Sequence, residues 1–366
     1  MPNDAPPLTI RGLAVRTVNP PIDPPVRTSA GTLAAAPLVL LDLHTDEGVT
    51  GRAYVFAYTP AALGPTAAMA ANLAPLVAGR RLAPAALTRE LAQRFRLLGT
   101  EGLVGMALAL FDMSAWDAVA RAAGLPLARL LGATGEERIP AYCSLRAWDA
   151  AALADEAGRA VAAGFRAVKL KFGHPTLEAE RETCRAVRAA VGDAVEILVD
   201  PNQAFTVPEA IRRARHYAEW GIAWLEEPVR AGDLAGHAAI RRAVPSLPVQ
   251  RGENDWGPEG IAASLAAGAS DLLMPDVMKV GGVTGWMEAG ALCKAAGVPM
   301  SSHLFIETSA HLLAATPGRD RLEWLDLARP VLAAGSPALA EGCAVPGSAP
   351  GIGLEWDEAA IARYAA

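Results

Sequence analysis

Three acidic residues recur at nearly constant spacing in the second half of this 366-residue chain. Asp200, Glu226 and Glu253 are 26 and 27 residues apart, and each stands at the end of a short apolar run. If those runs are neighbouring parallel strands, about 4.8 Å apart, the three carboxylates can converge on one point. Buried carboxylates repel one another unless a cation neutralises them, and an all-oxygen site favours a hard ion such as Mg²⁺ or Mn²⁺. Helix capping or pairing with a lysine would explain any one of them, but the trio in register favours a metal site.

Two lysines, Lys169 and Lys171, end an earlier apolar run. Because side chains alternate along a strand, both lie on one face, among mostly apolar neighbours. Two buried cations lower each other's pKa, and burial lowers it further, which can bring a lysine toward neutral pH, where it acts as a base. A solvated edge or a pairing with a barrel carboxylate is the alternative, and the carboxylate cluster favours the functional interpretation.

The last apolar runs end in or carry Asp276, His303 and Glu323. Asp276 can accept the ring N–H of His303 and so fix the tautomer of a histidine base. A lone histidine is more often a packing residue, so this interpretation depends on the polar cluster around it. Glu323, next to a substrate carboxylate, can stay protonated and donate a hydrogen bond. A salt bridge from Glu323 to Arg321 or to a lysine is an equally good interpretation of that residue alone.

The elements that must position these residues alternate between strands and helices. From about residue 139, short apolar runs are separated mostly by Ala- and Arg-rich stretches of about 10–15 residues with helical periodicity. This alternation predicts parallel strands with right-handed crossovers, hence an α/β fold, and eight units predict a (β/α)₈ TIM-type barrel whose site lies at the carboxyl ends of the strands. The eight runs are IPAYCS, FRAVKLKFG, VEILVDPN, IAWLEEP, PVQRGEN, DLLMPD, VPMSSHL and RLEWLD.

The first part of the chain has a different texture. Residues 1–60 contain β-rich runs interrupted by prolines, and residues 61–132 are helical in pattern. We therefore predict an N-terminal α+β capping domain over residues 1–135, a catalytic barrel over residues 136–335, and a C-terminal segment, 336–366, that returns to the capping domain.

The composition excludes several classes of function. A formal net charge of −6 argues against a nucleic-acid surface and gives no attraction to anionic membranes. No uninterrupted apolar run reaches the roughly 18–20 residues that span a bilayer, and the first residues do not have the pattern of a secretory signal. The four cysteines are dispersed, which is typical of reduced cytoplasmic thiols and not of a disulfide framework or a zinc site.

Long ordered motifs along nearly the whole chain resemble those of the enolase superfamily, and within it the mandelate racemase subgroup. They are APLVLLDL, VFAYTP, DMSAWDA, FRAVKLKFG, VDPNQ, WLEEP, GEN, MPDVMKVGGVTGW and PMSSHLFIETSAHLLAATP. The resemblance implies a barrel with a capping domain built from both chain ends, and Mg²⁺, with Mn²⁺ as a substitute, held by Asp200, Glu226 and Glu253. It selects Glu226 over the adjacent Glu227, a choice that strand alternation leaves open.

The resemblance also implies the catalytic roles. Lys171 would be the base on one face of the substrate, and His303, held by Asp276, the base on the other. Lys169 would touch the substrate carboxylate and depress the pKa of Lys171, while Glu323 would donate a hydrogen bond to the enediolate intermediate that forms when the α-proton leaves.

Family positions near the substrate are matched by Ser144, Asn202 and Lys279, and the segment 26–31 with Tyr58 matches the region that covers the substrate. Two residues of this segment depart from the mandelate racemase pattern, since Ala30 replaces a valine and Arg27 replaces a histidine. If Arg27 points inward, it favours a second carboxylate or a polyhydroxylated substrate. Otherwise it faces solvent.

We therefore expect racemisation of a 2-hydroxy acid such as mandelate, with acid-sugar dehydration on the same site as the alternative. A Schiff-base aldolase barrel using Lys171 would not need three carboxylates, and a non-catalytic role leaves the polar cluster unexplained. The expected partner is a small-molecule carboxylate, with no nucleic acid and no membrane. From the dispersed cysteines we expect a cytoplasmic protein, and by resemblance a homo-oligomer, an octamer or a dimer.

Overall fold

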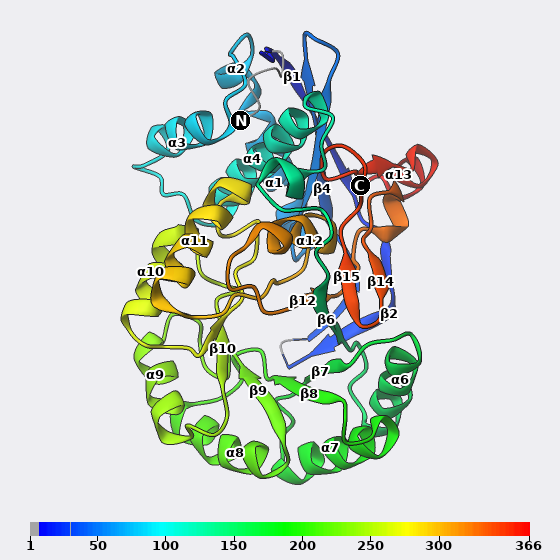
Figure 1. Ribbon diagram of the computed structural model, residues 1–366, viewed down its shortest axis with the longest axis vertical. Helices are drawn as coiled ribbons and strands as arrows, with labels where there is room; N and C mark the ends of the chain where they lie inside the picture. Colours follow the sequence, from blue (N-terminus) through cyan, green and yellow to red (C-terminus); the bar gives the residue numbers. More distant parts are fainter. Residues whose placement is uncertain (1–6, 30) are drawn as a thin grey trace.

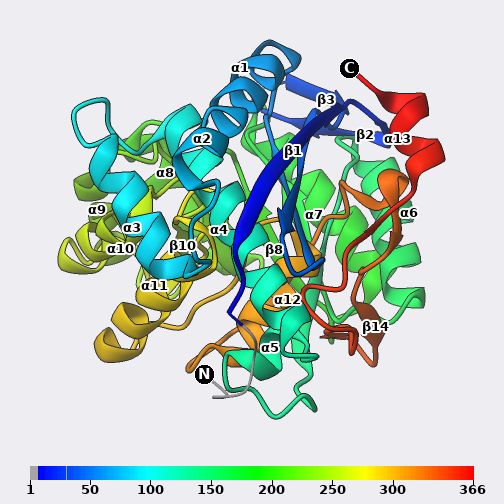
Figure 2. The ribbon, with the colours of Figure 1, turned by 90° about the horizontal axis from the view of Figure 1, so that it is seen from above.

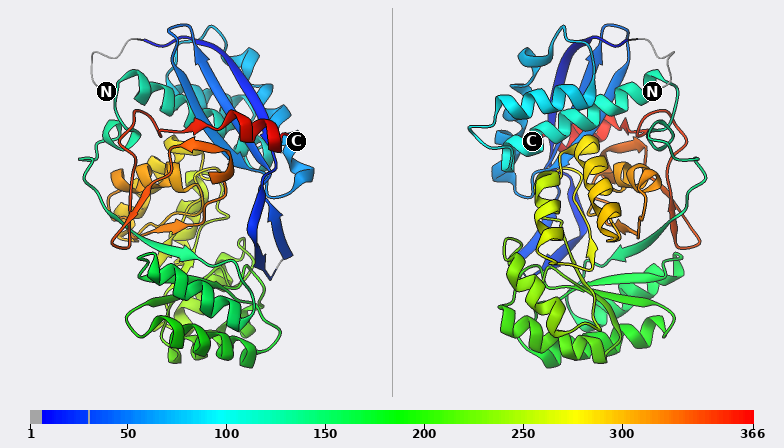
Figure 3. Two further views of the ribbon diagram at one scale, coloured as in Figure 1. Left: turned by 90° about the vertical axis from the view of Figure 1, so that its right-hand side faces the viewer. Right: turned by 60° about the vertical axis from the view of Figure 1, so that its left-hand side comes forward.

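The computed structural model describes residues 7–29 and 31–366, so Ala30 of the substrate-covering segment lies outside the described residues. Its upper part is a three-stranded antiparallel sheet of order β1-β4-β5 (Figure 1), formed by β1 (Ile10–Val18), β4 (Leu38–Thr45) and β5 (Thr50–Phe56). Between the first two strands, the hairpin of β2 (Pro21–Thr28) and β3 (Gly31–Ala35) leaves this sheet and reaches down toward the barrel (Figure 3).

Helices complete the capping domain. They are α1 (Pro60–Ala71), α2 (Ala74–Val77), α3 (Pro84–Arg94), α4 (Gly102–Ala122) and the short α5 (Leu127–Leu130). Within the described part of the chain, α4 is the one helix long and apolar enough to cross a membrane by length and composition. However, 83% of its most apolar window is buried, because α4 packs between β5 and the helices around it, so it is a core helix of this domain.

The lower part is the predicted (β/α)₈ barrel. Its regular strands, each parallel to the next, are β6 (Ile139–Ser144), β7 (Ala167–Lys171), β8 (Glu196–Asp200), β9 (Ile222–Glu226), β10 (Val249–Arg251), β11 (Leu272–Leu273) and β12 (Leu322–Trp324). The expected seventh run is reduced to isolated parallel bridges. Met300 pairs with Leu273 and Arg319, and the pairing of β12 with β6 then closes the ring.

The crossover helices begin where the sequence offers side-chain caps. Asp149, Thr176, Thr206 and Asp233 each accept a hydrogen bond from a backbone N–H of the first turn that follows. The helices are α6 (Ala150–Ala162), α7 (Leu177–Val191), α8 (Val207–Glu219), α9 (Leu234–Ala243), α10 (Gly257–Ala266), α11 (Gly282–Ala296) and α12 (Ile306–Ala315).

The C-terminal segment contacts both parts of the molecule. It contains a 3₁₀ turn (Arg329–Val331), β13 (Leu332–Ala334), β14 (Ala338–Ala340), β15 (Cys343–Val345), β16 (Glu355–Trp356) and α13 (Glu358–Tyr364). First, β15 pairs antiparallel with the barrel strand β6. Then Trp356 Nε1 donates to Asp42 of β4 at 2.8 Å. The chain end that follows α13 comes near the end of β1 (Figure 2), where Ala365 and Val18 form an antiparallel bridge.

A buried polar contact docks the capping domain on the barrel. Asp112 of α4 accepts from the backbone N–H of Thr284 at 2.9 Å and from its hydroxyl at 2.5 Å, at the beginning of α11. Burial raises the pKa of Asp112 to about 6, although the hydrogen bonds from Thr284 and Thr88 oppose the shift. This contact fixes one side of the capping domain to the barrel, while the β2–β3 hairpin contributes residues to the cavity between the two parts.

Candidate active site

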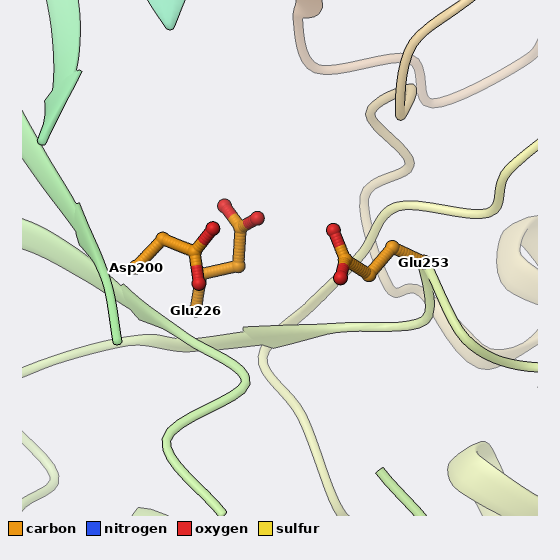
Figure 4. Close-up of side chains that lie close together, drawn as sticks. All are labelled: Asp200, Glu226 and Glu253. Carbon is orange, nitrogen blue, oxygen red and sulfur yellow. The ribbon is translucent and has the colours of Figure 1, made fainter. Parts of the chain in front are cut away.

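The predicted trio of carboxylates converges at the carboxyl ends of the barrel strands. Asp200 and Glu226 are the last residues of β8 and β9, and Glu253 follows β10. One oxygen from each lies within 4.8 Å of the other two, and all three residues are buried (Figure 4). Burial, together with the charges of Asp200 and Glu253, raises the pKa of Glu226 well above its usual range, against the opposing effect of Lys169. The carboxylates of the cluster therefore disfavour one another's ionised forms, and a cation bound among them would relieve that repulsion.

The donor set of this cluster fits a divalent cation. All three residues offer carboxylate oxygens, which hard ions such as Mg²⁺ prefer. The Oε2 atom of Glu226 is buried and has no hydrogen-bond partner among the described residues, as expected of a ligand atom. The adjacent Glu227 points elsewhere and accepts hydrogen bonds from Gly252 N–H, Asn254 Nδ2 and Gln203 Nε2.

The two lysines lie within this cluster. Lys169, fully buried, has its Nζ 2.7 Å from Glu226 Oε1 and 2.7 Å from Glu323 Oε1, and Lys171 Nζ lies 2.5 Å from Asp200 Oδ2. The predicted lowering of the lysine pKa is not what the structure shows. Burial, the largest effect, lowers the pKa of Lys171, and the charge of Lys169 lowers it too, as the resemblance implies. The charges of the carboxylates, Asp200 first, together raise it above its usual value, and the pKa of Lys169 is also raised. Carboxylate pairing, which was the alternative interpretation, dominates here.

His303 lies on the other side of the cluster. Its Nδ1 atom is 2.7 Å from Asp276 Oδ2, and its Nε2 atom is 2.9 Å from Glu253 Oε2. Burial disfavours the charged ring, but the charge of Glu253 and the hydrogen bond to Asp276 raise the pKa of His303 to about 10. The structure thus brings together the histidine and the aspartate that the sequence paired.

The charge state of Glu323 is set by its neighbours in the barrel. Burial would raise its pKa, but the charges of Lys169 and His303 lower it to about 2. The same carboxylate accepts a hydrogen bond from Leu304 N–H at 3.1 Å. In this arrangement Glu323 is ionised and paired with Lys169, which corresponds to the salt-bridge interpretation of this residue.

A cavity of about 360 Å³ opens above the cluster. The lining is mixed and includes the ionisable residues Lys171, His303, Glu253 and Glu323, uncharged polar residues and apolar side chains. The uncharged polar residues are Thr28, Thr32, Tyr58, Asn202, Gln203 and Asn254. The apolar side chains, from both the capping domain and the barrel, are Val26, Leu33, Phe56, Leu304, Leu325 and Leu327.

The predicted substrate-binding residues divide into two groups. Tyr58 and Asn202 line the cavity. Lys279 lies beside it, with its Nζ 4.7 Å from the ring centre of Tyr58 and 2.6 Å from Asn254 Oδ1. Ser144 is buried at the end of β6, in register with Lys169, and its hydroxyl has no partner among the described residues.

Arg27 does not join the site in this structure. Its side chain is exposed and is not among the described residues that line the cavity. The reason is strand alternation, since Val26 is buried against the cavity and its neighbour in β2 must point the other way. Arg27 therefore faces solvent, which was the second of its two interpretations. It gives no support for a second substrate carboxylate at this position.

Several lining residues were not predicted. Asn254 and Gln203 face the cavity and also hydrogen-bond to Glu227. Asn254 directly follows Glu253 in the motif GEN, so position in the motif could have identified it. The apolar residues Leu33, Phe56 and Leu325 carry no chemical signal in the sequence, because an apolar residue next to a cavity looks like any core residue.

The sequence matches two protein-family models, and the structure is similar to solved structures. A family model described as "Enolase C-terminal domain-like" matches residues 152–360, and one for the mandelate racemase / muconate lactonizing enzyme N-terminal domain matches residues 10–132. The chain is similar to a Bradyrhizobium enolase crystallised with magnesium and mandelic acid, with 41% identity and a TM-score of 0.93 over 99% of each chain.

Two further relatives act on sugar-derived acids, as their names state. The chain is 31% identical to a 3,6-anhydro-alpha-L-galactonate cycloisomerase of Streptomyces coelicolor, over 74% of this chain and 75% of the relative. It is also 31% identical to an L-talarate/galactarate dehydratase of Salmonella typhimurium, over 63% of this chain and 58% of the dehydratase.

Proposed function

The chain belongs to the mandelate racemase/muconate lactonizing enzyme group of the enolase superfamily, and from this membership we propose that it racemises a 2-hydroxy acid such as mandelate. The reaction removes the proton on the carbon beside the carboxylate and returns a proton to the opposite face. The observation that carries the proposal is that two candidate bases, Lys171 and His303, line one cavity beside a carboxylate cluster that can hold a cation.

Asp200, Glu226 and Glu253 would hold Mg²⁺, which is present in several similar structures, and Mn²⁺ could substitute for it. When bound, the ion supplies fixed positive charge beside the substrate carboxylate as negative charge develops there. The α-proton of a carboxylate is very weakly acidic, because its loss adds charge to a group that is already charged. Stabilisation of that charge is therefore the main task of the site.

We propose that Lys171 and His303 act as bases from different sides of the substrate. Lys171 Nζ is next to Asp200, whereas His303 Nε2 is next to Glu253, and these two carboxylates lie on opposite sides of the cluster in Figure 4. A substrate bound between them presents one face of its α-carbon to each base. Asp276 holds the other ring nitrogen of His303 and so orients Nε2 toward the substrate. One base removes the proton and the other supplies one, which inverts the stereocentre.

Lys169 and Glu323 are the residues best placed to meet the charge of the enediolate. Both are buried, and their side chains are in contact at 2.7 Å. A substrate carboxylate that enters between them would gain a cation from Lys169 and would add a like charge next to Glu323. That like charge favours the protonated form of Glu323, which can then donate a hydrogen bond.

The cavity lining favours the racemase over the dehydratase. Apolar side chains such as Val26, Leu33 and Phe56 suit an aromatic or aliphatic substituent. A polyhydroxylated acid would leave these side chains facing hydroxyl groups and would have to rely on the polar part of the lining, such as Asn202 and Asn254. The solvent-facing Arg27 removes one such partner. The similarity to the L-talarate/galactarate dehydratase keeps acid-sugar dehydration as the second candidate, since the same two bases can remove a proton and assist the loss of a β-hydroxyl.

Proton NMR of enantiopure (S)-mandelate with enzyme and Mg²⁺ in D₂O, followed by chiral analysis, tests the proposal. Loss of the α-proton signal together with appearance of the other enantiomer is the expected result. Retention of the signal for mandelate, together with elimination from an aldonate or aldarate, would replace the racemase with the dehydratase.

Further parts of the proposal concern organisation. We assign residues 1–135 and 336–366 to the capping domain and residues 136–335 to the catalytic barrel. We also place the enzyme in the cytoplasm as a homo-oligomer, an octamer or a dimer. Size-exclusion chromatography with light scattering measures the number of subunits, and a monomeric mass would contradict that assignment.

A further inference from the structure

One of the three clustered carboxylates is not held by a strand. Asp200 and Glu226 are the last residues of β8 and β9, whereas Glu253 lies two residues beyond the end of β10 at Arg251. Figure 4 shows Glu253 on a loop, facing the other two carboxylates from the opposite side. The hydrogen bonds of the sheet fix Asp200 and Glu226, but the position of Glu253 depends on the conformation of its loop.

That loop is a tight turn with Glu253 and Asn254 at its centre. The backbone N–H of Asp255 donates to the carbonyl of Gly252 at 3.1 Å, which closes the turn. Gly252 has a φ of +118°, a conformation that favours glycine, and its own N–H donates to Glu227 at 3.2 Å. The turn thus presents Glu253 to the site from a backbone that has no ladder pairing of its own.

A buried ion pair closes the same turn from behind. Nη1 and Nη2 of Arg251 donate to the two carboxylate oxygens of Asp255 at 2.8 and 2.7 Å, in a two-pronged geometry. Arg251 is fully buried and Asp255 is 8% exposed. The Ser264 hydroxyl of α10 donates to Asp255 at 2.6 Å, and Arg251 Nη2 donates to the carbonyl of Ala231 at 2.9 Å. The pair therefore ties the turn to a helix and to the loop that follows β9.

Resting on the proposed function, we infer that Arg251 and Asp255 are positioning residues that set the affinity of the site for its divalent cation by fixing Glu253. Neither residue lines the cavity among the described residues, so neither is placed to touch the substrate. Groups that orient a metal ligand without binding the metal typically change its affinity about 10–100-fold when they are removed. The ion pair is suited to this task because it spans the two ends of the turn that carries the ligand.

Isothermal titration of Mg²⁺ into the purified full chain, without substrate, tests the inference. Asp255→Asn and Arg251→Met are expected to bind Mg²⁺ about 10–100-fold more weakly than the wild type. The Mg²⁺ affinity of Arg251→Lys is expected to lie between that of the wild type and that of Arg251→Met. Arg121→Met is the matched control, because Arg121 and Asp117 form a pair of the same sequence spacing, 2.6 Å apart and with Asp117 fully buried, within α4 of the capping domain. This control should lose thermal stability but keep wild-type Mg²⁺ affinity.

The outcomes separate this inference from the proposed function. Wild-type Mg²⁺ affinity in folded Asp255→Asn would overturn the inference and leave the proposed function intact, as would an equal loss of affinity in Arg121→Met. A wild-type chain that does not bind Mg²⁺ would overturn the proposed function itself, and the inference with it. If Arg251→Met does not fold, the Mg²⁺ affinities of Asp255→Asn and Ser264→Ala decide the question. The first variant removes the charge that pairs with Arg251, the second removes the hydroxyl that donates to Asp255, and both keep Arg251.

Discussion

His303 and Asp276 are joined by both backbone and side chain at the carboxyl end of the barrel. The two residues form a parallel bridge, and the ring Nδ1 of His303 lies 2.7 Å from Asp276 Oδ2. The other oxygen of Asp276 accepts from Met278 N–H at 2.8 Å, so the carboxylate cannot turn away. This arrangement leaves Nε2 as the ring nitrogen that faces the cluster, where it lies 2.9 Å from Glu253.

If His303 and Lys171 are separate bases, removing one of them should largely abolish racemisation but leave proton exchange at the face served by the other. We expect His303→Asn to reduce racemisation about 10²–10⁴-fold, because a general base is worth about that much. The enantiomer that presents its α-proton to Lys171 should still exchange that proton with D₂O, which NMR detects. His216→Asn, on the surface helix α8, should leave both activities unchanged. Equal loss of exchange from both enantiomers in His303→Asn would show that the two bases do not act separately.

Binding of Mg²⁺ should stabilise the folded chain, since Asp200, Glu226 and Glu253 converge only after folding. At about 100 times the dissociation constant, a ligand adds about 2.7 kcal/mol to the free energy of unfolding, which corresponds to a rise in Tm of several degrees. Differential scanning fluorimetry with and without Mg²⁺ measures this rise, and EDTA should abolish both the rise and the activity. Glu226→Gln is expected to lose the response, and a wild-type Tm that is indifferent to millimolar Mg²⁺ would speak against the site.

Much of this candidate site could be predicted from the sequence because most of its polar residues end an apolar run. A polar residue at the carboxyl end of a buried parallel strand lies at the rim of the barrel. For this reason Asp200, Glu226 and His303 could be predicted to lie close together. The Glu226/Glu227 choice required the family resemblance. The structure then shows Glu226 in the cluster and Glu227 bonded to neighbouring loops.

The features that sequence reasoning missed depend on contacts between distant segments. The charge state of Lys171 depends on Asp200 on the next strand, and that of Glu323 depends on Lys169, whose strand β7 lies on the other side of β6 from β12. Burial alone, which is all that an apolar neighbourhood reveals, predicts the opposite shift for both groups. The direction of Arg27 depends on which face of a two-stranded hairpin meets the cavity, and the prolines of that segment hide its alternation.

The apolar lining of the cavity should control the choice of substrate. We expect Leu33→Ala, which truncates a half-buried lining residue, to lower kcat/KM for mandelate about 10–200-fold, the usual cost of lost apolar contact in such a pocket. Arg27→Ala, in the same hairpin but facing solvent, should change kcat/KM less than about twofold, because surface substitutions of this kind cost little. A large loss of kcat/KM in Arg27→Ala would show that Arg27 contacts the substrate and would favour the acid-sugar alternative.

Stability should fall with rising pH because of Glu307, which accepts from the Tyr54 hydroxyl at 2.6 Å and is 1% exposed. Burial, followed by the charge of Asp326, raises the pKa of Glu307 to about 8. Below about pH 4, Glu307 is protonated in both the folded and the unfolded chain, so its titration does not lower the free energy of unfolding. Between about pH 4 and 8 the unfolded chain releases the proton while the folded chain retains it, so stability declines by up to about 4–5 kcal/mol.

Glu307→Gln removes this titration while keeping an acceptor for Tyr54. We expect the difference in the free energy of unfolding between pH 5 and pH 8, measured by urea denaturation, to shrink in the variant. Glu136→Gln at an exposed position should leave the pH dependence as it is in the wild type. If Glu307→Gln and the wild type show the same pH dependence, the carboxyl group does not carry the effect.

The contact between the capping domain and the barrel can be tested with two glycines of one helix. Gly282 and Gly297 flank α11 at its beginning and just after its end, with φ of +73° and +68°. An added Cβ at Gly282 would lie 2.5 Å from Asp112 Oδ1 and 2.8 Å from its Cβ, whereas one at Gly297 would meet nothing within 4 Å. Gly297→Ala should therefore cost only backbone strain, about 1–2 kcal/mol. Gly282→Ala should cost that strain and also displace Asp112 from Thr284, for about 3 kcal/mol or more by urea denaturation, because a buried carboxylate then loses its donors. Equal destabilisation by the two substitutions would mean that Asp112 does not hold the domains together.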